Sequence, residues 1–285
     1  MKYIIYILLF FPIWVTAQTY KYIGIEDGLS NRRIFNIQKD AQGYMWFLTN
    51  EGMDRYNGKD IKHYKLNKEG NTLDAPIRLG WLYTEPHIGI WVIGKQGRIF
   101  QYDANKDDFR MVYRLPDTSE TISCGYLDRN NNIWLCRKDT VLLYNIKDAR
   151  IFQFPNVLHS SITAIEQVDE HHFFIATEAG VRYVKQENNV LEIIPVETLD
   201  YFHAQVSELY FHQQLKRLFI GSFERGLFVY DTNTQEIIRP DADLSDVNIA
   251  RISPLNETEL LIATEGMGVY KVDVNTCKLE HYIVA

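Results

Sequence analysis

The sequence contains little that would cross-link the chain or carry it through a membrane. Its 285 residues include three cysteines and eight prolines, and the formal net charge is -7. So few cysteines, in an odd number, exclude a disulfide framework. The negative net charge and the lack of a basic run argue against nucleic-acid or anionic-membrane partners, because proteins bind these through clustered lysine and arginine. After the N-terminus no apolar run is long enough for a transmembrane helix, so none is expected in this chain.

The N-terminus has the layout of a secretory signal. Lys2 supplies a short positive region, residues 4–15 form an apolar run, and residues 15–17 are small or medium-sized. The run is too short to span a bilayer comfortably. We therefore predict that residues 1–17 are a signal peptide and that the mature chain is periplasmic. The alternative is a buried N-terminal strand.

Internal repeats determine the expected fold. In residues 30–64, four short alternating strands are joined by turns that contain glycine, asparagine and aspartate. Two markers show that this unit recurs about every 43 residues. The first is a large second-strand side chain at Trp46, Trp91, Trp134, Phe174, Phe219 and Leu261. The second is a third-strand tyrosine at Tyr56, Tyr102, Tyr144, Tyr183, Tyr230 and Tyr270.

This period is typical of four-stranded propeller blades, and the alternation with period two excludes a solenoid of helix pairs. We predict one all-β domain over residues 18–285, a β-propeller with about six visible blades. Recurrent aromatic residues fill the wedges between successive sheets, so both markers are interpreted as structural. The blades are expected near residues 30–64, 76–113, 121–154, 161–194, 205–238 and 247–282.

The number of blades in the complete ring stays open. Residues 20–25 alternate like an outermost strand, and an N-terminal strand commonly completes the last blade of a propeller. The sixth blade already has its own fourth strand at residues 279–282, so residues 20–25 would complete a seventh blade whose inner strands are missing. An incomplete seven-bladed propeller is therefore expected. The rival is a six-bladed ring in which one blade has five strands.

The first blade resembles a known family in four segments: residues 26–31 (Glu-Asp-Gly-Leu-Ser-Asn), 34–38, 43–47 (Gly-Tyr-Met-Trp-Phe) and 52–58 (Gly-Met-Asp-Arg-Tyr-Asn-Gly). They are similar to the two-component regulator propeller repeat of periplasmic sensors in hybrid two-component systems, especially those of gut Bacteroidetes. The resemblance continues at lower density through the later blades. Leu48 departs from it, because the family usually has glycine there.

The resemblance implies a long membrane protein with two propellers, a β-sandwich, a histidine kinase, a receiver and a DNA-binding segment, often responsive to oligosaccharides. This chain contains only the propeller part. We therefore expect a periplasmic ligand-sensing module, glycan-responsive and a fragment of such a sensor. Its partners would be an oligosaccharide and the rest of a sensor kinase or a second propeller. The alternative is a standalone periplasmic protein-interaction scaffold.

No catalytic constellation is present in the sequence. None of the eight histidines has zinc-site spacing, and no Gly-x-Ser-x-Gly elbow occurs. We expect no enzyme activity, no cofactor and no metal. Residues 128–132 (Asp-Arg-Asn-Asn-Asn) resemble the start of a calcium loop, but the glycine and glutamate that such a loop needs are missing. Turn chemistry is the favoured interpretation of this segment.

Topology alone places a candidate binding surface. Loops between second and third strands, and between blades, share one face of a propeller around its channel. Guanidinium groups there would suit carboxylate-bearing or hydroxyl-rich ligands such as acidic sugars, although scattered loop charges are also what a solvated face contains. The candidate ligand-binding residues are Arg32, Arg33, Arg78, Lys95, Arg137, His203, Glu224 and Arg225, with Lys138 beside them.

One cysteine pair has a predicted register. If Leu127 faces Ile133 across the turn at residues 128–132, Cys124 faces Cys136 on the neighbouring strand. Such a pair can form a cross-strand disulfide in an oxidising compartment. The alternative is two small apolar residues that pack against each other.

Overall fold

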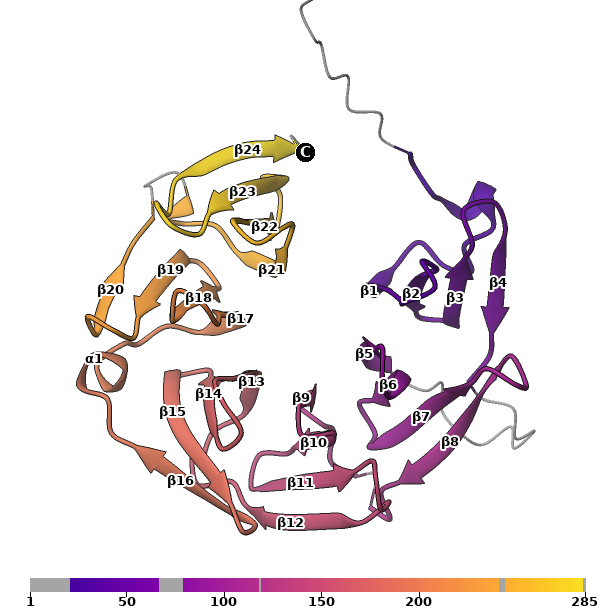
Figure 1. The fold of residues 1–285 in the computed structure, drawn as a ribbon, viewed down its shortest axis with the longest axis horizontal. Coiled ribbons are helices and arrows are strands. Elements are labelled where there is room, and N and C mark those ends of the chain that lie inside the picture. Colours follow the sequence, from indigo (N-terminus) through magenta and orange to yellow (C-terminus); the bar gives the residue numbers. More distant parts are fainter. Residues whose placement is uncertain (1–20, 67–78, 118, 241–243, 284–285) are drawn as a thin grey trace, which may run out of the picture.

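The computed structural model describes residues 21–66, 79–117, 119–240 and 244–283. Across these ranges the chain forms six four-stranded sheets, each with its strands in sequential order. Figure 1 shows the sheets arranged radially, with the first strand of each nearest the centre. The predicted β-propeller with six visible four-stranded blades is therefore confirmed. The predicted signal peptide, residues 1–17, lies outside the described residues.

The blades have the following bounds, in chain order. Blades 1 to 3 contain β1 (Ile34–Lys39), β2 (Met45–Thr49), β3 (Gly52–Tyr56), β4 (Ile61–Tyr64), β5 (Leu79–Glu85), β6 (Gly89–Gly94), β7 (Arg98–Asp103), β8 (Asp108–Arg114), β9 (Cys124–Leu127), β10 (Asn132–Cys136), β11 (Thr140–Asn145) and β12 (Ile151–Pro155). Blades 4 to 6 contain β13 (Ile162–Gln167), β14 (His172–Thr177), β15 (Gly180–Glu187), β16 (Val190–Ile194), β17 (Val206–His212), β18 (Arg217–Ser222), β19 (Gly226–Asp231), β20 (Glu236–Ile238), β21 (Ile249–Pro254), β22 (Glu259–Thr264), β23 (Val269–Asp273) and β24 (Leu279–Ile283).

The second-strand tryptophans are structural, as predicted. Trp46, Trp91 and Trp134 are at most 2% exposed. Two of them are fixed by an aspartate in the turn before the second strand. Asp40 Oδ2 accepts a hydrogen bond from Trp46 Nε1 at 2.7 Å, and Asp128 Oδ2 accepts one from Trp134 Nε1 at 2.9 Å. The turn residue and the tryptophan therefore form one unit that places the ring between blades.

Asp128 shows why its segment only resembles a calcium loop. Its carboxylate also accepts hydrogen bonds from the backbone N–H groups of Asn130 and Asn132 and from the Asn132 side chain. The residue is 3% exposed, and burial raises the pKa of its carboxyl group despite these bonds. The carboxylate is thus occupied by the turn and the tryptophan, which is the turn chemistry expected from the sequence.

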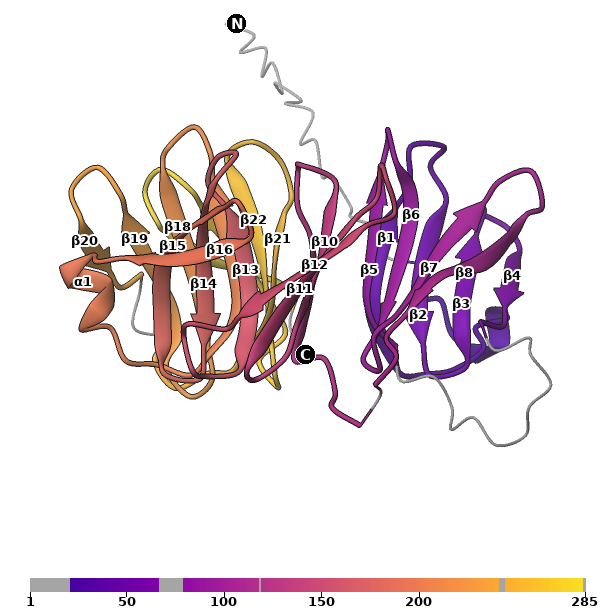
Figure 2. The ribbon, with the colours of Figure 1, turned by 90° about the horizontal axis from the view of Figure 1, so that it is seen from below.

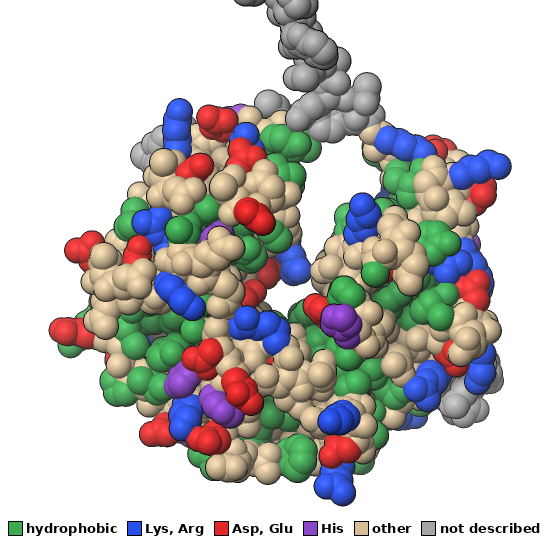
Figure 3. All heavy atoms as spheres, in the orientation of Figure 1, with side chains coloured by type: hydrophobic (Ala, Val, Ile, Leu, Met, Phe, Trp, Pro, Cys, Tyr) green, Lys and Arg blue, Asp and Glu red, His purple; other side chains and the backbone are tan. Residues whose placement is uncertain are grey.

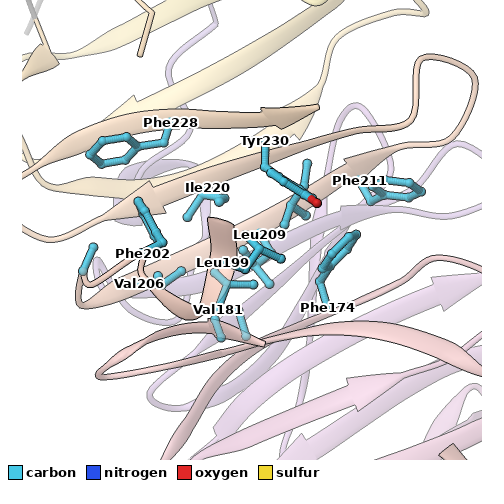
Figure 4. Close-up of a cluster of buried hydrophobic side chains, with 14 residues drawn as sticks. Phe174, Val181, Leu199, Phe202, Val206, Leu209, Phe211, Ile220, Phe228 and Tyr230 are labelled. Atoms are coloured by element: carbon cyan, nitrogen blue, oxygen red, sulfur yellow. The ribbon is translucent and has the colours of Figure 1, made fainter. Parts of the chain in front are cut away.

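Apolar wedges hold neighbouring blades together. Figure 4 shows the cluster between blades 4 and 5, where Phe174 of β14 and Val181 of β15 meet Leu209 and Phe211 of β17. The short helix α1 (Glu197–Asp200) adds Leu199, which is fully buried. Each such side chain contributes about 1.5–3 kcal/mol by leaving water. Packing between blades, rather than within one sheet, therefore forms most of the core.

The cysteine register is confirmed. Cys124 of β9 and Cys136 of β10 are directly opposite, as are Leu127 and Ile133. Both cysteines are buried free thiols, and burial raises the pKa of Cys136. In this structure the pair packs as two small apolar side chains rather than as a disulfide.

The ring is open. Inner strands link the blades in series through β1–β5, β5–β9, β9–β13, β13–β17 and β17–β21. Figure 1 shows an opening between blade 6 and blade 1, and the opening remains in the space-filling view of Figure 3.

The predicted strand at residues 20–25 is wrong for the part that the structure describes. Residues 21–24 pair with no strand, and Ile25–Asp27 form a 3-10 turn closed by Leu29 N–H donating to Gly24 O. Ile23 and Leu29 pack on Phe47, on the side of blade 1 that faces the opening. An edge strand forms only beside a partner, and no further strand lies beside these residues within the described ranges.

Candidate functional site

The two ends of the propeller carry different turns. In each blade the strands alternate in direction, so the β2–β3 type of turn and the connections between blades lie at one end. The β1–β2 and β3–β4 types of turn lie at the other end. Figure 2 shows the strands running between these two ends, with the turns gathered at both. The ligand-binding residues predicted from the sequence, apart from Arg78 outside the described ranges, belong to the first end, which we call the connection face.

Three of the predicted residues come together at blade 5. Arg225 Nη1 donates to the backbone carbonyl of His203, and the guanidinium carbon lies 5.6 Å from the Phe228 ring centroid. Glu224 N–H donates to Asn248 Oδ1 at 2.8 Å. These contacts tie the β18–β19 turn to the neighbouring connections, while the side chains of His203, Glu224 and Arg225 stay exposed.

The other predicted residues lie apart from this group and contact their own neighbours. Arg137 is 12% exposed, donates to Asp117 O and lies 4.0 Å from Glu120. Lys95 Nζ is 6.0 Å from the Trp81 ring centroid, and Arg33 stacks on Phe35 at 5.2 Å. Arg32 and Lys138 are exposed, and Arg78 lies outside the described residues. The connection face therefore offers dispersed charges, and their role in ligand binding stays a prediction.

A second group of polar residues follows the inner strands. Each second-strand marker pairs with one residue of the first strand in its blade. These partners are Gln38, Tyr83, Tyr126, Glu166, Tyr210 and Ser253. All six are polar or hydroxyl-bearing, although the marker on the next strand is apolar or aromatic. The innermost strand of every blade therefore carries a polar residue at the same register position.

Charged groups on the inner strands of three successive blades come close together. Arg251 Nη1 of β21 donates to Glu208 Oε2 of β17 at 3.1 Å, with side chains 46% and 20% exposed. Glu166 of β13 interacts electrostatically with both Glu208 and Arg251. Tyr83 lies within electrostatic reach of all three from blade 2. In Figure 3, acidic and basic side chains are visible at the wall of the central hollow.

We call Tyr83, Tyr126, Glu166, Glu208 and Arg251 the channel cluster. Tyr83 OH donates to Gly125 O at 2.8 Å, and Tyr126 OH accepts from Gln167 N–H at 3.2 Å. The rings of the two tyrosines lie edge to face at 6.4 Å.

Burial controls the charge of the two carboxyl groups. It raises the pKa of Glu166 to about 8, and the neighbouring Glu208 raises it further, while the Phe211 N–H, Arg129 and Arg251 oppose the shift. Burial also raises the pKa of Glu208, against the effect of Arg251. Glu166 therefore holds a proton at neutral pH, and the cluster offers hydrogen-bond donors and acceptors with little net charge.

Sequence reasoning missed the channel cluster. For Tyr83, Tyr126 and Glu166 the signal is a polar residue at a fixed place in the first strand of each repeat, but an alternating strand has polar residues on its solvent side anyway. Glu208 and Arg251 occupy a different register position, so only the folded structure shows that they lie near Glu166. Among the described residues no group of three or more His, Cys, Asp or Glu side chains could hold a metal ion.

The comparisons with known proteins agree with the resemblance of the first blade. Residues 28–51 match the family model described as two component regulator propeller. This segment ends in the turn after β2. The fold and the match define a β-propeller that carries one recognisable repeat of this type. No curated protein matches the sequence.

Solved structures share the fold at low sequence identity. The extracellular domain of what is named the hybrid two component system BT3049 of B. thetaiotaomicron has 19% identity and a TM-score of 0.71, over 93% of this chain and 36% of that one. The corresponding domain of BT4673 has 18% identity and a TM-score of 0.68, over 93% and 34%. A streptogramin B lyase has 17% identity and a TM-score of 0.67, over 88% and 83%. The chain thus spans about a third of the length of the first two structures.

The structure also bears on membrane insertion. Over the described ranges, no helix is long and apolar enough to cross a membrane.

Proposed function

We propose that this chain is the ligand-sensing propeller module of a hybrid two-component regulator, that it is periplasmic, and that it responds to a glycan. In this proposal the propeller binds a ligand and catalyses no reaction. An oligosaccharide and the rest of a sensor kinase, or a second propeller, are its partners.

The match of residues 28–51 to the two component regulator propeller carries this proposal. The match spans β1 and β2, which are complete strands of a regular blade. Similar folds in domains named as extracellular parts of hybrid two component systems support it. The predicted signal peptide supports export of the module.

We further propose that a seventh blade completes the ring. Ile37 of β1 faces the opening and is 49% exposed. The residues at its register position in blades 2, 4, 5 and 6 are buried against the preceding blade, with exposures of 0–4% for Leu82, Ile165, Leu209 and Ile252. Because the blades repeat one structural unit, we propose that a further sheet covers Ile37 in the same way.

The alternative function, a standalone interaction scaffold, predicts a closed ring. The opening beside blade 1 supports the sensor module instead. Phe35, which is 40% exposed, adds a second apolar side chain near Ile37. Further protein is therefore proposed to cover this side of blade 1.

Calorimetric titration tests the glycan response. We expect the full-length secreted chain to bind one class of oligosaccharide when titrated with neutral oligosaccharides from starch, cellulose and mannan and with acidic ones from pectin and alginate. A single-site isotherm for one class, absent for the others, is the expected result. If none of these oligosaccharides releases heat or raises the melting temperature, the glycan proposal is wrong.

A further inference from the structure

A pocket lies between blades 1 and 2, at the end opposite the connection face. Its volume is about 310 Å³, at the lower end of the range of small-molecule sites. The β1–β2 turn contributes Asp40 and Gln42, the β5–β6 turn contributes Glu85, and Tyr44 and Tyr102 line the wall. Both tyrosines are half-buried, whereas the Trp46 ring beneath them is fully buried. A ligand in the pocket would thus meet tyrosine rings and planar polar groups.

The aromatic wall is held rigidly by an ionic network. Arg55 lies 4.8 Å from the Tyr44 ring centroid and donates to Tyr102 OH at 2.7 Å. Its Nη1 also donates to Asp107 Oδ1 at 2.9 Å, and the side chain is 17% exposed. Asp107 further accepts from Tyr102 OH at 2.6 Å and from Lys62 at 2.5 Å. The bonds from Arg55 and Lys62 join blade 1 to blade 2, and together with the Tyr102 bond they hold the pKa of Asp107 well below its usual range.

The β1–β2 turn is also fixed. Asp40 Oδ1 accepts from the backbone N–H groups of Gln42 and Tyr44, at 3.0 and 2.9 Å. The Gln42 side chain is exposed, and no hydrogen bond of its amide group is recorded among the described residues. Near the end of β5, Thr84 Oγ1 donates to Lys39 O at the end of β1 at 2.9 Å. The strand ends from which the two flanking turns start are therefore joined, which limits the loop ordering that binding would require.

The charges of the lining disfavour anions. The charged lining residues are Asp40, Arg55 and Glu85, with a formal net charge of -1. Because Arg55 already forms an ion pair with Asp107, its positive charge is largely compensated within the protein. An acidic ligand would meet two carboxylates and no unpaired cation in the lining. The pocket therefore selects against the acidic sugars that the connection face suggested.

We propose that this pocket binds one or two rings of a neutral saccharide, which assigns the glycan response to the junction of blades 1 and 2 rather than to the connection face. A pyranose ring has one apolar C–H face, which suits the face of Tyr44 or Tyr102, and rim hydroxyls, which suit amide and carboxylate groups. This inference rests on the proposed glycan-sensing function and specifies its site and ligand class.

Three variants of the full-length secreted chain test the site by calorimetric titration with maltose, cellobiose, mannobiose and digalacturonic acid. Tyr44→Ala removes a stacking face, and Gln42→Ala removes an exposed amide without touching the core. Tyr201→Ala is the matched control, because Tyr201 is an aromatic residue 76% exposed at the end of α1, outside the pocket. We expect at least one neutral disaccharide to bind, Tyr44→Ala and Gln42→Ala to weaken it about tenfold, and Tyr201→Ala to leave it unchanged.

The outcomes separate the site from the function. Neutral disaccharide binding that survives both pocket variants overturns the site and leaves the glycan-sensing function standing. Binding of digalacturonic acid alone overturns the neutral class. If no saccharide binds to the unaltered chain, both the site and the glycan response are rejected. Glu85→Lys adds an independent test that does not depend on folding of the core: it is expected to admit digalacturonic acid, and its failure to do so contradicts the charge argument.

Discussion

Replacing Gly226 by alanine is expected to lower the free energy of unfolding by about 3–5 kcal/mol. Gly226 begins β19 with φ +71°, a conformation that residues with a Cβ rarely adopt. A Cβ there would lie 1.7 Å from the carbonyl oxygen of Leu244, in the connection to blade 6. The backbone must therefore move, and with it the hydrogen bond from Gly226 N–H to Val247 O. Denaturant and thermal unfolding measure the loss.

Gly266→Ala is the matched control for this experiment. Gly266 has φ +90°, but a Cβ there meets nothing within 4 Å. It should lose only about 1 kcal/mol, the cost of the backbone conformation alone. Equal losses in the two variants would contradict the claim that close approach of the blade connections, rather than conformation, fixes this turn.

Glu166→Gln is expected to remove a pH dependence of stability. The folded state raises the pKa of Glu166 from 4.5 to about 8, so it holds the proton more tightly than the unfolded chain does. This stabilisation is fully present below about pH 4.5 and is lost as the pH rises to about 8. Glutamine has nearly the same shape as protonated glutamate and stays uncharged at every pH. The variant should match the parent near pH 5 and exceed it by about 2–3 kcal/mol near pH 9, because partial exposure of Glu166 to solvent reduces the full shift.

Unfolding measured from pH 5 to pH 9 tests this expectation. The charged and titratable groups that act on Glu166 are Glu208, Arg129 and Arg251, with Tyr126 and Tyr210 beside it. Glu192→Gln, at an exposed position of β16, is the control and should keep the pH profile of the parent. A Glu166→Gln variant with the same profile as the parent would show that Glu166 ionises normally in the folded chain.

Most of the fold was predictable because the repeat of about 43 residues shows where each strand of a blade recurs in the sequence. Trp46, Trp91 and Trp134 marked the second strands, and their burial explains why they recur. At residues 20–25, alternation alone led to a strand that the described residues do not form. Alternation shows that a segment can pair, but a strand also needs a neighbour, and Gly24 instead begins a 3-10 turn.

The candidate sites were less predictable, for a geometric reason. Topology placed Lys95, Arg137 and Arg225 at one end of the propeller, but loop side chains bond to whatever neighbour is nearest. The channel cluster and the saccharide pocket each combine residues about 40 or more positions apart, such as Glu166 with Glu208 and Tyr44 with Glu85. Their proximity depends on how adjacent blades are rotated, which no local pattern encodes.

The central claim is that this propeller is the sensing module of a two-component regulator, and reading the coding DNA past Ala285 tests it most directly. The account predicts an open reading frame that supplies a seventh blade to cover Ile37, and then a membrane helix and a histidine kinase. A stop codon immediately after Ala285 would contradict the account and favour the standalone scaffold.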